Sequence, residues 1–262
     1  MKWLIFMGLI LDNKSIGLYE KWLLSPAGRA LDGFAQGLIT GLLSPHKNEK
    51  ILDIGCGTGN QLISLSRLGF NLSGVDASPA MIEIAKGRLG NRCELKTGRA
   101  EDLPFSDNEF DIALLVNTLE FLDEPLTALK EAGRVSRKKI LICVINSLSL
   151  HNLGDRIRGV FLDSLSRHVR QYHLWEMKSY IKNAFGSVPM DWRCAQDWPQ
   201  IKRSHNISDP DTQISFNCPV GALLGISVTL NPLIRADSLT LKIKAESPFP
   251  EGAPIQNQGG MY

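Results

Sequence analysis

The sequence predicts a doubly wound α/β fold with a mostly parallel, seven-stranded sheet, helices on both faces and an antiparallel last strand. Short apolar runs alternate with amphipathic stretches through the middle of the chain, and the runs are almost continuously Val, Ile and Leu. Strands that are buried on both faces have this composition, whereas half-exposed strands alternate. The order strand, helix, strand, helix is typical of a parallel sheet with right-handed crossovers.

Two helices are expected ahead of the sheet. Apolar residues recur at helical spacing from Ser15 to Leu43, and Pro26 and Gly28 interrupt the pattern. Residues 1–44 are therefore expected to form an N-terminal helical segment.

Five short strands are expected next, in chain order. Turn signals follow apolar runs at residues 51–54, 72–75, 93–95, 112–116 and 140–145. Amphipathic helices are expected between them at residues 60–68, 79–89 and 125–135. The second of these helices has Ser78 as its predicted N-cap and Pro79 at its first position.

The rest of the chain is expected to complete the sheet. Residues 147–187 are expected to be a helical insertion at the carboxyl edge of the sheet, ending in a helix from Leu174 to Phe185. Two late apolar runs are expected to pair as an antiparallel hairpin, at residues 188–194 and 222–230. The last residues have the composition of a flexible tail. We therefore expect three parts: residues 1–44, 45–230 and 231–262.

Composition favours a globular protein without a nucleic-acid partner. The chain is 44% hydrophobic, and 29 basic against 27 acidic side chains leave a formal charge of +2. The longest basic run, residues 134–139, is interpreted as cations at a helix C-terminus. Five cysteines show neither a Cys-x-x-Cys pair nor metal-ligand spacing, so we expect reduced thiols in a cytoplasmic protein and no metal site.

The apolar run at residues 3–11 is the one feature that favours targeting or membrane association. It is too short to cross a bilayer, which takes about 20 residues. A signal peptide is an alternative, but no small-x-small cleavage site follows the run. We expect no stable membrane insertion. An extra helical turn or an upstream start codon are the other interpretations.

A glycine-rich turn follows the first predicted strand. The segment Leu52–Gly59 reads Leu-Asp-Ile-Gly-Cys-Gly-Thr-Gly and leads from a strand into a helix, which is the context in which such a turn binds a nucleotide. Gly55 and Gly57 permit the tight turn, and Gly59 lets the following helix pack close to the strand. Glycine turns also occur where nothing binds, so the turn alone is weak support for a ligand.

Acidic residues strengthen the prediction of a ligand site at this edge. Asp53 lies in the apolar strand, where a carboxylate costs energy unless an ammonium group or backbone amides meet it. Asp76 ends the next strand, about 20 residues on, where an acid can accept hydrogen bonds from both hydroxyls of a ribose. The segment Gly98–Phe105 follows the third strand and contains Glu101 and Asp102. These acids are expected at the same carboxyl edge of the sheet.

Together these residues resemble the class I S-adenosylmethionine-dependent methyltransferases, particularly the group that includes the ubiquinone and menaquinone C-methyltransferases. The resemblance covers Tyr19 to Phe185. It implies a Rossmann-like fold, S-adenosyl-L-methionine as the cofactor, and methyl transfer to a small-molecule acceptor by in-line displacement at the sulfonium methyl. Tyr19, Trp22 and Arg29 resemble the family's N-terminal helical lid, which folds over the cofactor.

The resemblance also implies roles for single residues. In the family the glycine turn holds the methionine and ribose part of the cofactor, and the acid matched by Asp76 holds the ribose. The segment matched by Ala100–Asp102 borders the adenine, and that matched by Val116–Phe121 faces the methionine. The cofactor-binding positions so implied are Asp53, Gly55, Cys56, Gly57, Gly59, Asp76, Ala77, Met81, Ala100, Glu101 and Asn117.

Two positions depart from the family pattern. Arg99 stands where many relatives carry an acid or amide that reads the adenine amino group, so we expect Glu101 or the backbone to make that contact. The segment Ser136–Lys139 replaces the usual Pro-Gly-Gly turn before the fifth strand, on the edge of the sheet far from the expected site.

Methyl transfer requires no protein nucleophile, because alignment and exclusion of water supply much of the acceleration. The sequence leaves three candidates for a catalytic residue. His168, in a segment that resembles the family's acceptor side, is a candidate base or else a surface histidine. Glu120 is expected either beside the cofactor or acceptor, or as a solvated helix residue. Tyr19 belongs either to the lid or to an ordinary amphipathic helix.

Two other functions fit the same turn. A non-catalytic, regulatory module that binds S-adenosylmethionine would use the same residues. An NAD-dependent dehydrogenase is disfavoured, because its fingerprint has Gly or Ala where this chain has Asn60, and because Asp53 would lie close to a pyrophosphate. A hydrophobic acceptor is expected from the apolar side chains of the segments that would surround it, which include Trp22, Phe34, Phe161 and Trp175.

Overall fold

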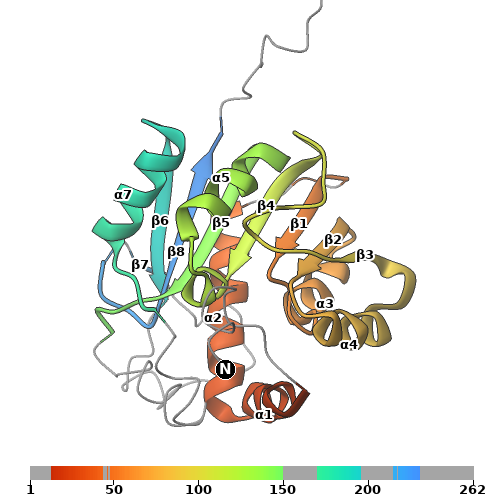
Figure 1. Ribbon diagram of the computed structural model, residues 1–262. Coiled ribbons are helices and arrows are strands. Elements are labelled where there is room, and N and C mark those ends of the chain that lie inside the picture. Colours follow the sequence, from red (N-terminus) through yellow and green to blue (C-terminus); the bar gives the residue numbers. More distant parts are fainter. Residues whose placement is uncertain are drawn as a thin grey trace, which may run out of the picture. The chain divides into compact units, whose positions relative to one another are not determined.

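The computed structural model describes residues 13–43, 46, 48–149, 170–195, 215–216 and 218–230. Within them the chain forms one eight-stranded sheet in the order β3-β2-β1-β4-β5-β8-β6-β7 (Figure 1). The strands are β1 Lys50–Ile54, β2 Asn71–Asp76, β3 Cys93–Thr97, β4 Phe110–Val116, β5 Ser136–Ile145, β6 Met190–Ala195, β7 Ser215–Phe216 and β8 Leu223–Thr229. The predicted α/β class with a mostly parallel sheet is confirmed.

Parallel pairing joins the first five strands. β1 lies between β2 and β4, and its Asp53 has Gly74 on one side and Leu114 on the other. β3 and β5 extend the sheet in parallel from β2 and β4. β8 pairs antiparallel with both β5 and β6, as predicted. β7 was not predicted, because its two residues are too few to show a period.

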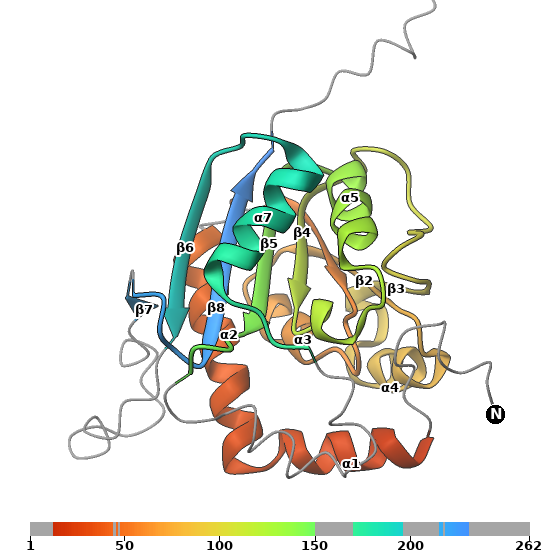
Figure 2. The same cartoon turned by 60° about the vertical axis from the view of Figure 1, so that its left-hand side comes forward.

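Helices cover both faces of the sheet (Figures 1 and 2). The described helices are α1 Asn13–Leu23, α2 Pro26–Leu43, α3 Asn60–Ser66, α4 Pro79–Leu89, α5 Pro125–Val135 and α7 Leu174–Phe185, with short 3₁₀ turns η1 Gly90–Arg92 and η2 Leu119–Phe121. Neighbouring residues of β1 point to opposite faces. Ile51 therefore packs in a core with α2, α3 and α4, and Leu52 in a core with α5 and α7.

The break between the two N-terminal helices is confirmed, but it lies at Pro26 alone. Gly28 is in the first turn of α2, where an added Cβ would lie 2.2 Å from the backbone oxygen of Trp22. Glycine at this position therefore lets α1 pack closely against the start of α2. α2 then crosses β5, β8 and β6, and Gly225 of β8 lets Leu42 approach the strand.

The basic run at residues 134–139 differs from its predicted role. α5 leads directly into β5, so Arg137 and Lys138 lie in the strand. Arg137 Nε donates to Asp111 Oδ1 at 2.9 Å, and Lys138 Nζ lies 2.9 Å from both Asp111 Oδ1 and Glu49 Oε1. The interpretation as helix-end cations was wrong for these two residues, because acids beside the starts of β1 and β4 pair with them.

Several predictions fall outside the described residues. They concern the apolar run at residues 3–11, the helical pieces and His168 within residues 150–169, and the tail at residues 231–262. The domain boundaries at residues 45 and 231 stay predictions. In the part of the chain that the structure describes, no helix combines the length and apolar character needed to cross a membrane.

Candidate functional site

The glycine turn leaves β1 with three left-handed residues, Gly55, Gly57 and Gly59, before α3 begins. Gly55 has a φ of 74°, and an added Cβ would lie 2.4 Å from Cγ2 of Thr118. A side chain at this position is therefore excluded twice, by backbone conformation and by contact. The turn thus brings the end of β1 against the residues that follow β4.

Asp76, at the end of β2, holds the turn directly. Its Oδ2 accepts a hydrogen bond from Gly57 N at 2.9 Å, and its Oδ1 accepts one from Ser78 N at 2.8 Å. Burial raises the pKa of Asp76 above its usual value, although the two amides oppose that effect. An ionised carboxylate offers about four acceptor positions, so two remain for a ligand. Asp76 and the glycine turn therefore face the same space.

Asp53 is a buried carboxylate that lines this space, with 2% of its surface exposed. It makes no hydrogen bond or ion pair with any other residue that the structure describes. Burial, and secondarily the charge of Asp76, raises its pKa to about 8. An acid in this state gains most from a cationic ligand, because an opposite charge would favour its ionised form.

The segment Gly98–Glu101 forms a second wall. Gly98 N donates to Asp76 O at 3.0 Å, which ties the wall to β2. Oε2 of Glu101 lies 3.4 Å from Arg99 Nη2, so the arginine that departs from the family pattern pairs with the neighbouring acid. Oε1 of Glu101 is buried and has no hydrogen-bond partner among the described residues. One acceptor oxygen of this wall is therefore available to a ligand.

Asn117, directly after β4, contributes another acceptor. Its φ is 52°, a left-handed conformation that asparagine tolerates better than most residues. Its backbone N–H donates to Cys143 O at 2.8 Å. Its Oδ1 is buried without a hydrogen-bond partner in the described part of the chain. Thr118 Oγ1 donates to Ile54 O at 2.9 Å and fixes the two strand ends together.

α1 lies at the edge where the parallel strands end (Figure 2), and three of its residues line the pocket. Tyr19 and Trp22 stack with ring centroids 6.2 Å apart and both line the pocket. Between them, Glu20 forms an ion pair with Arg88 of α4 and accepts a hydrogen bond from Thr58 Oγ1 at 2.7 Å. These contacts attach α1 to the glycine turn and to α4.

The structure brings together in one pocket nearly all the predicted cofactor positions. The lining includes Asp53, Gly55, Cys56, Gly57, Asp76, Ala77, Met81, Ala100, Glu101 and Asn117. Gly59 is not in the lining. An added Cβ there would lie 2.9 Å from Leu89 Cδ1 and 3.3 Å from Ala85 Cβ, so its close approach is to α4, not to a strand as predicted.

The three catalytic candidates have different surroundings. Tyr19 lines the pocket, and burial raises the pKa of its hydroxyl far above the usual value. Glu120 is 1% exposed, so its interpretation as a solvated residue was wrong. Its Oε1 accepts a hydrogen bond from Ile145 N at 2.7 Å, and burial raises its pKa to about 7. His168 lies outside the described residues.

The pocket also contains polar residues that the sequence interpretation missed. Asp32 of α2 accepts a hydrogen bond from Gln61 Nε2 of α3 at 2.7 Å, and both residues line the pocket. Burial raises the pKa of Asp32 above its usual value. The available signal was that Asp32 is the only acid in α2, most of whose other residues are apolar or small.

Comparison with known proteins finds similarity to methyltransferases. A sequence model of the family described as "Methyltransferase domain" matches residues 52–144. An O-methyltransferase of Aspergillus sclerotiorum is 34% identical over 101 residues, which are 36% of this chain and 38% of that protein. A demethylmenaquinone methyltransferase of Clavibacter sepedonicus is 34% identical over 108 residues, 40% of this chain and 44% of that protein. The matches thus span less than half the length of these relatives.

A solved structure extends the likeness to most of the described chain. It is an S-adenosylmethionine-dependent methyltransferase of Thermotoga maritima, described as a possible histamine N-methyltransferase. The two chains are 25% identical, with a TM-score of 0.61 over 82% of this chain and 95% of the other. Residues 52–144 therefore match a methyltransferase domain, and the fold of the chain is similar to that of an S-adenosylmethionine-dependent methyltransferase.

Proposed function

We propose that this protein binds S-adenosyl-L-methionine in the pocket beside the glycine turn and transfers its methyl group to a small, apolar acceptor. The observation that carries the proposal is the set of buried acceptor oxygens without partners in the described part of the pocket. Glu101 and Asn117 each supply one, and Asp53 adds a buried carboxylate with no hydrogen bond or ion pair among the described residues. Unpaired buried acceptors are costly, so they favour a ligand that brings several donors.

S-adenosylmethionine fits this donor requirement. Asp53 would hold its ammonium group, Asp76 its ribose hydroxyls, and Glu101 its adenine amino group. The glycine turn gives the ligand access to the backbone at Gly57, where an added Cβ would have only the Tyr19 hydroxyl within 4 Å, at 3.8 Å. When bound, the cofactor supplies a methyl group on a positively charged sulfur. The residues of the chain hold the reactants in line and exclude water.

The charge of the pocket argues against the dehydrogenase alternative. Its lining contains four acids, Asp32, Asp53, Asp76 and Glu101, and Arg99 as its one arginine, with no lysine among the described residues. A pyrophosphate would place two negative charges among these carboxylates. A sulfonium with an ammonium group places positive charge there instead. The acidic lining therefore favours S-adenosylmethionine over NAD.

The remaining wall of the pocket supports a hydrophobic acceptor. Its apolar lining comes from α1, α2, the ends of β4 and β5, and the segment after β4: Trp22, Leu23, Leu31, Val116, Phe121, Leu122 and Ile145. A large apolar wall with few polar groups is typical of a small-molecule site. The relatives named above act on different acceptors by their names, so they support a small molecule without identifying it.

Calorimetry with S-adenosylhomocysteine and with NAD tests the cofactor assignment. We expect binding of the first and none of the second, and failure to bind S-adenosylhomocysteine would contradict the proposal. A screen of methyl transfer from isotope-labelled cofactor to apolar phenols, amines and quinols then tests catalysis. Cofactor binding without transfer to any acceptor would favour the regulatory module.

A further inference from the structure

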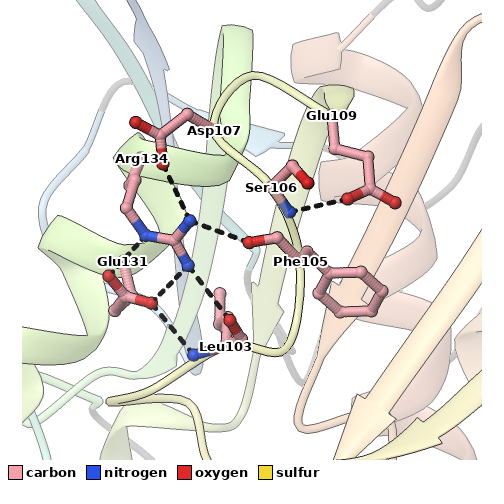
Figure 3. A network of polar contacts seen from close by, with 7 residues as sticks. All are labelled: Leu103, Phe105, Ser106, Asp107, Glu109, Glu131 and Arg134. Carbon is pink, nitrogen blue, oxygen red and sulfur yellow. Dashed lines mark hydrogen bonds and ion pairs between the residues drawn. The ribbon is translucent and has the colours of Figure 1, made fainter.

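The loop that follows the Gly98–Glu101 wall is held by two side chains of α5, Arg134 and Glu131 (Figure 3). Arg134 Nε and Nη2 each lie 2.7 Å from one carboxylate oxygen of Glu131. Arg134 Nη2 also donates to Leu103 O at 3.0 Å, and Nη1 donates to Phe105 O at 2.8 Å. Nη1 donates as well to Asp107 Oδ1 at 2.9 Å, so one guanidinium binds two carboxylates and two backbone carbonyls at once.

Leu103 is held at both of its backbone polar groups. Its N–H donates to Glu131 Oε2 at 2.9 Å, and its C=O accepts from Arg134. Leu103 lies only two residues after Glu101, which lines the pocket, whereas neither Arg134 nor Glu131 does. A shift of Leu103 would therefore pass to Glu101 through a single intervening residue.

The pair is suited to a fixed geometry. Its side chains are 23% and 19% exposed, so water screens them less than a surface ion pair. The hydrogen bond from Arg134 lowers the pKa of Glu131, and that from Glu131 raises the pKa of Arg134, so both stay charged around neutral pH. A planar fork that meets a carboxylate and carbonyls together cannot be reproduced by lysine.

We propose that Arg134 and Glu131 are positioning residues for the Gly98–Glu101 wall and thereby set how strongly the pocket prefers adenine over a purine that lacks the exocyclic amine. This inference rests on the proposed function. The wall is tied at one end to β2, through Gly98 N and Asp76 O, and at the other end to α5 through this pair. Without the second tie, the free oxygen of Glu101 loses its fixed direction.

The test compares two ligands on three proteins. Affinities for S-adenosylhomocysteine and S-inosylhomocysteine are measured by calorimetry on the wild type, Arg134→Met and the matched control Arg137→Met. Arg137 is also paired with an acid, Asp111, but at the opposite end of the sheet. We expect the wild type and the control to prefer S-adenosylhomocysteine by about tenfold, as for one hydrogen bond to a charged acceptor. In Arg134→Met the preference should fall to about threefold or less.

Hydrogen exchange provides a readout without ligand. The amide hydrogen of Leu103 should exchange faster in Arg134→Met than in the wild type. In Arg137→Met its exchange rate should equal that of the wild type. If Arg134→Met does not fold, Glu131→Gln serves the same test, because it keeps the shape of the side chain and removes its charge.

Three results would overturn the inference. A folded variant with the wild-type ligand preference overturns it while the proposed function stands. Unchanged exchange at Leu103 does the same. A wild type that binds neither ligand contradicts the proposed function, and the inference fails with it.

Discussion

The acids at the two ends of the parallel strands have opposite electrostatic surroundings. At the carboxyl end, Asp53 is buried with no cationic partner among the described residues, and burial raises its pKa to about 8. At the amino end, Asp111 is as buried, with 4% of its side chain exposed, but Arg137, Lys138 and Lys50 N all donate to it. Burial alone would raise the pKa of Asp111, but these hydrogen bonds outweigh it and hold the pKa well below its usual value.

The difference between these two acids separates a contribution to folding from a capacity to bind a ligand. An acid whose cationic partners lie within the chain, like Asp111, contributes to folding and has no unpaired charge to offer a ligand. An acid left without a partner costs folding energy and becomes useful only when a cation arrives. On the same strands, the amino end carries acids paired within the chain, and the carboxyl end carries the acids that we propose bind a ligand. We call these the structural edge and the ligand edge.

The largest expected effect is on binding, in Asp76→Ala. We expect S-adenosylhomocysteine affinity to fall at least tenfold, which corresponds to about 1.5–3 kcal/mol for lost hydrogen bonds to a charged acceptor. Calorimetry measures the change. The matched control is Asp111→Ala, at the other end of the sheet, which should leave the affinity unaltered. Wild-type affinity in Asp76→Ala would show that the turn and β2 do not share a ligand.

The ligand edge was largely predictable from the sequence, whereas its surroundings were not. Asp53 and Asp76 could be placed together because parallel strands align their carboxyl ends, and Ser78 caps α4 as its position predicts. Asp32 could not be placed, because its position depends on how α2 crosses the sheet. Glu120 could not be placed either, because its surroundings depend on β5, where Ile145 N donates to its carboxylate.

The next effect is on stability, in Asp111→Asn. The asparagine would keep the size of the side chain but weaken its bonds to Arg137 and Lys138. We expect the free energy of unfolding to fall by about 1–3 kcal/mol, as for a buried hydrogen bond to a charged group. Urea denaturation measures it. Cofactor affinity should not change, and a parallel loss of affinity would mean that the two edges are not independent.

Asp53→Asn is expected to have a smaller effect, which is a loss of ligand affinity without a loss of stability. The amide cannot form an ion pair with an ammonium group, so affinity for S-adenosylhomocysteine at pH 8.5 should fall about fivefold, or about 1 kcal/mol. Stability should stay unchanged or rise, because the variant removes a buried carboxyl that has no partner in the described chain. A loss of unfolding free energy as large as that of Asp111→Asn would contradict the distinction between the edges.

The smallest expected effect is the release of a proton when S-adenosylhomocysteine binds. With a pKa of about 8, Asp53 is mostly protonated at pH 7 in the free protein, and an ammonium group beside it favours the ionised form. Binding of S-adenosylhomocysteine should therefore release up to one proton, measured by calorimetry in buffers of different ionisation enthalpy. Affinity should rise about threefold per pH unit between pH 6.5 and 8, below the limit of about tenfold for one proton, and then level off.

Asp53→Asn should abolish both the proton release and this part of the pH dependence, which separates the effect of Asp53 from that of Asp76 in the same pocket.

The pH dependence of the unfolding free energy should have opposite signs for Asp53 and Asp111. Because its folded pKa is raised, the contribution of Asp53 is lost as pH rises toward about 8. Because its folded pKa is lowered, the contribution of Asp111 is lost as pH falls below its usual titration range. Equal slopes for Asp53→Asn and Asp111→Asn would mean that the two acids have the same surroundings after all.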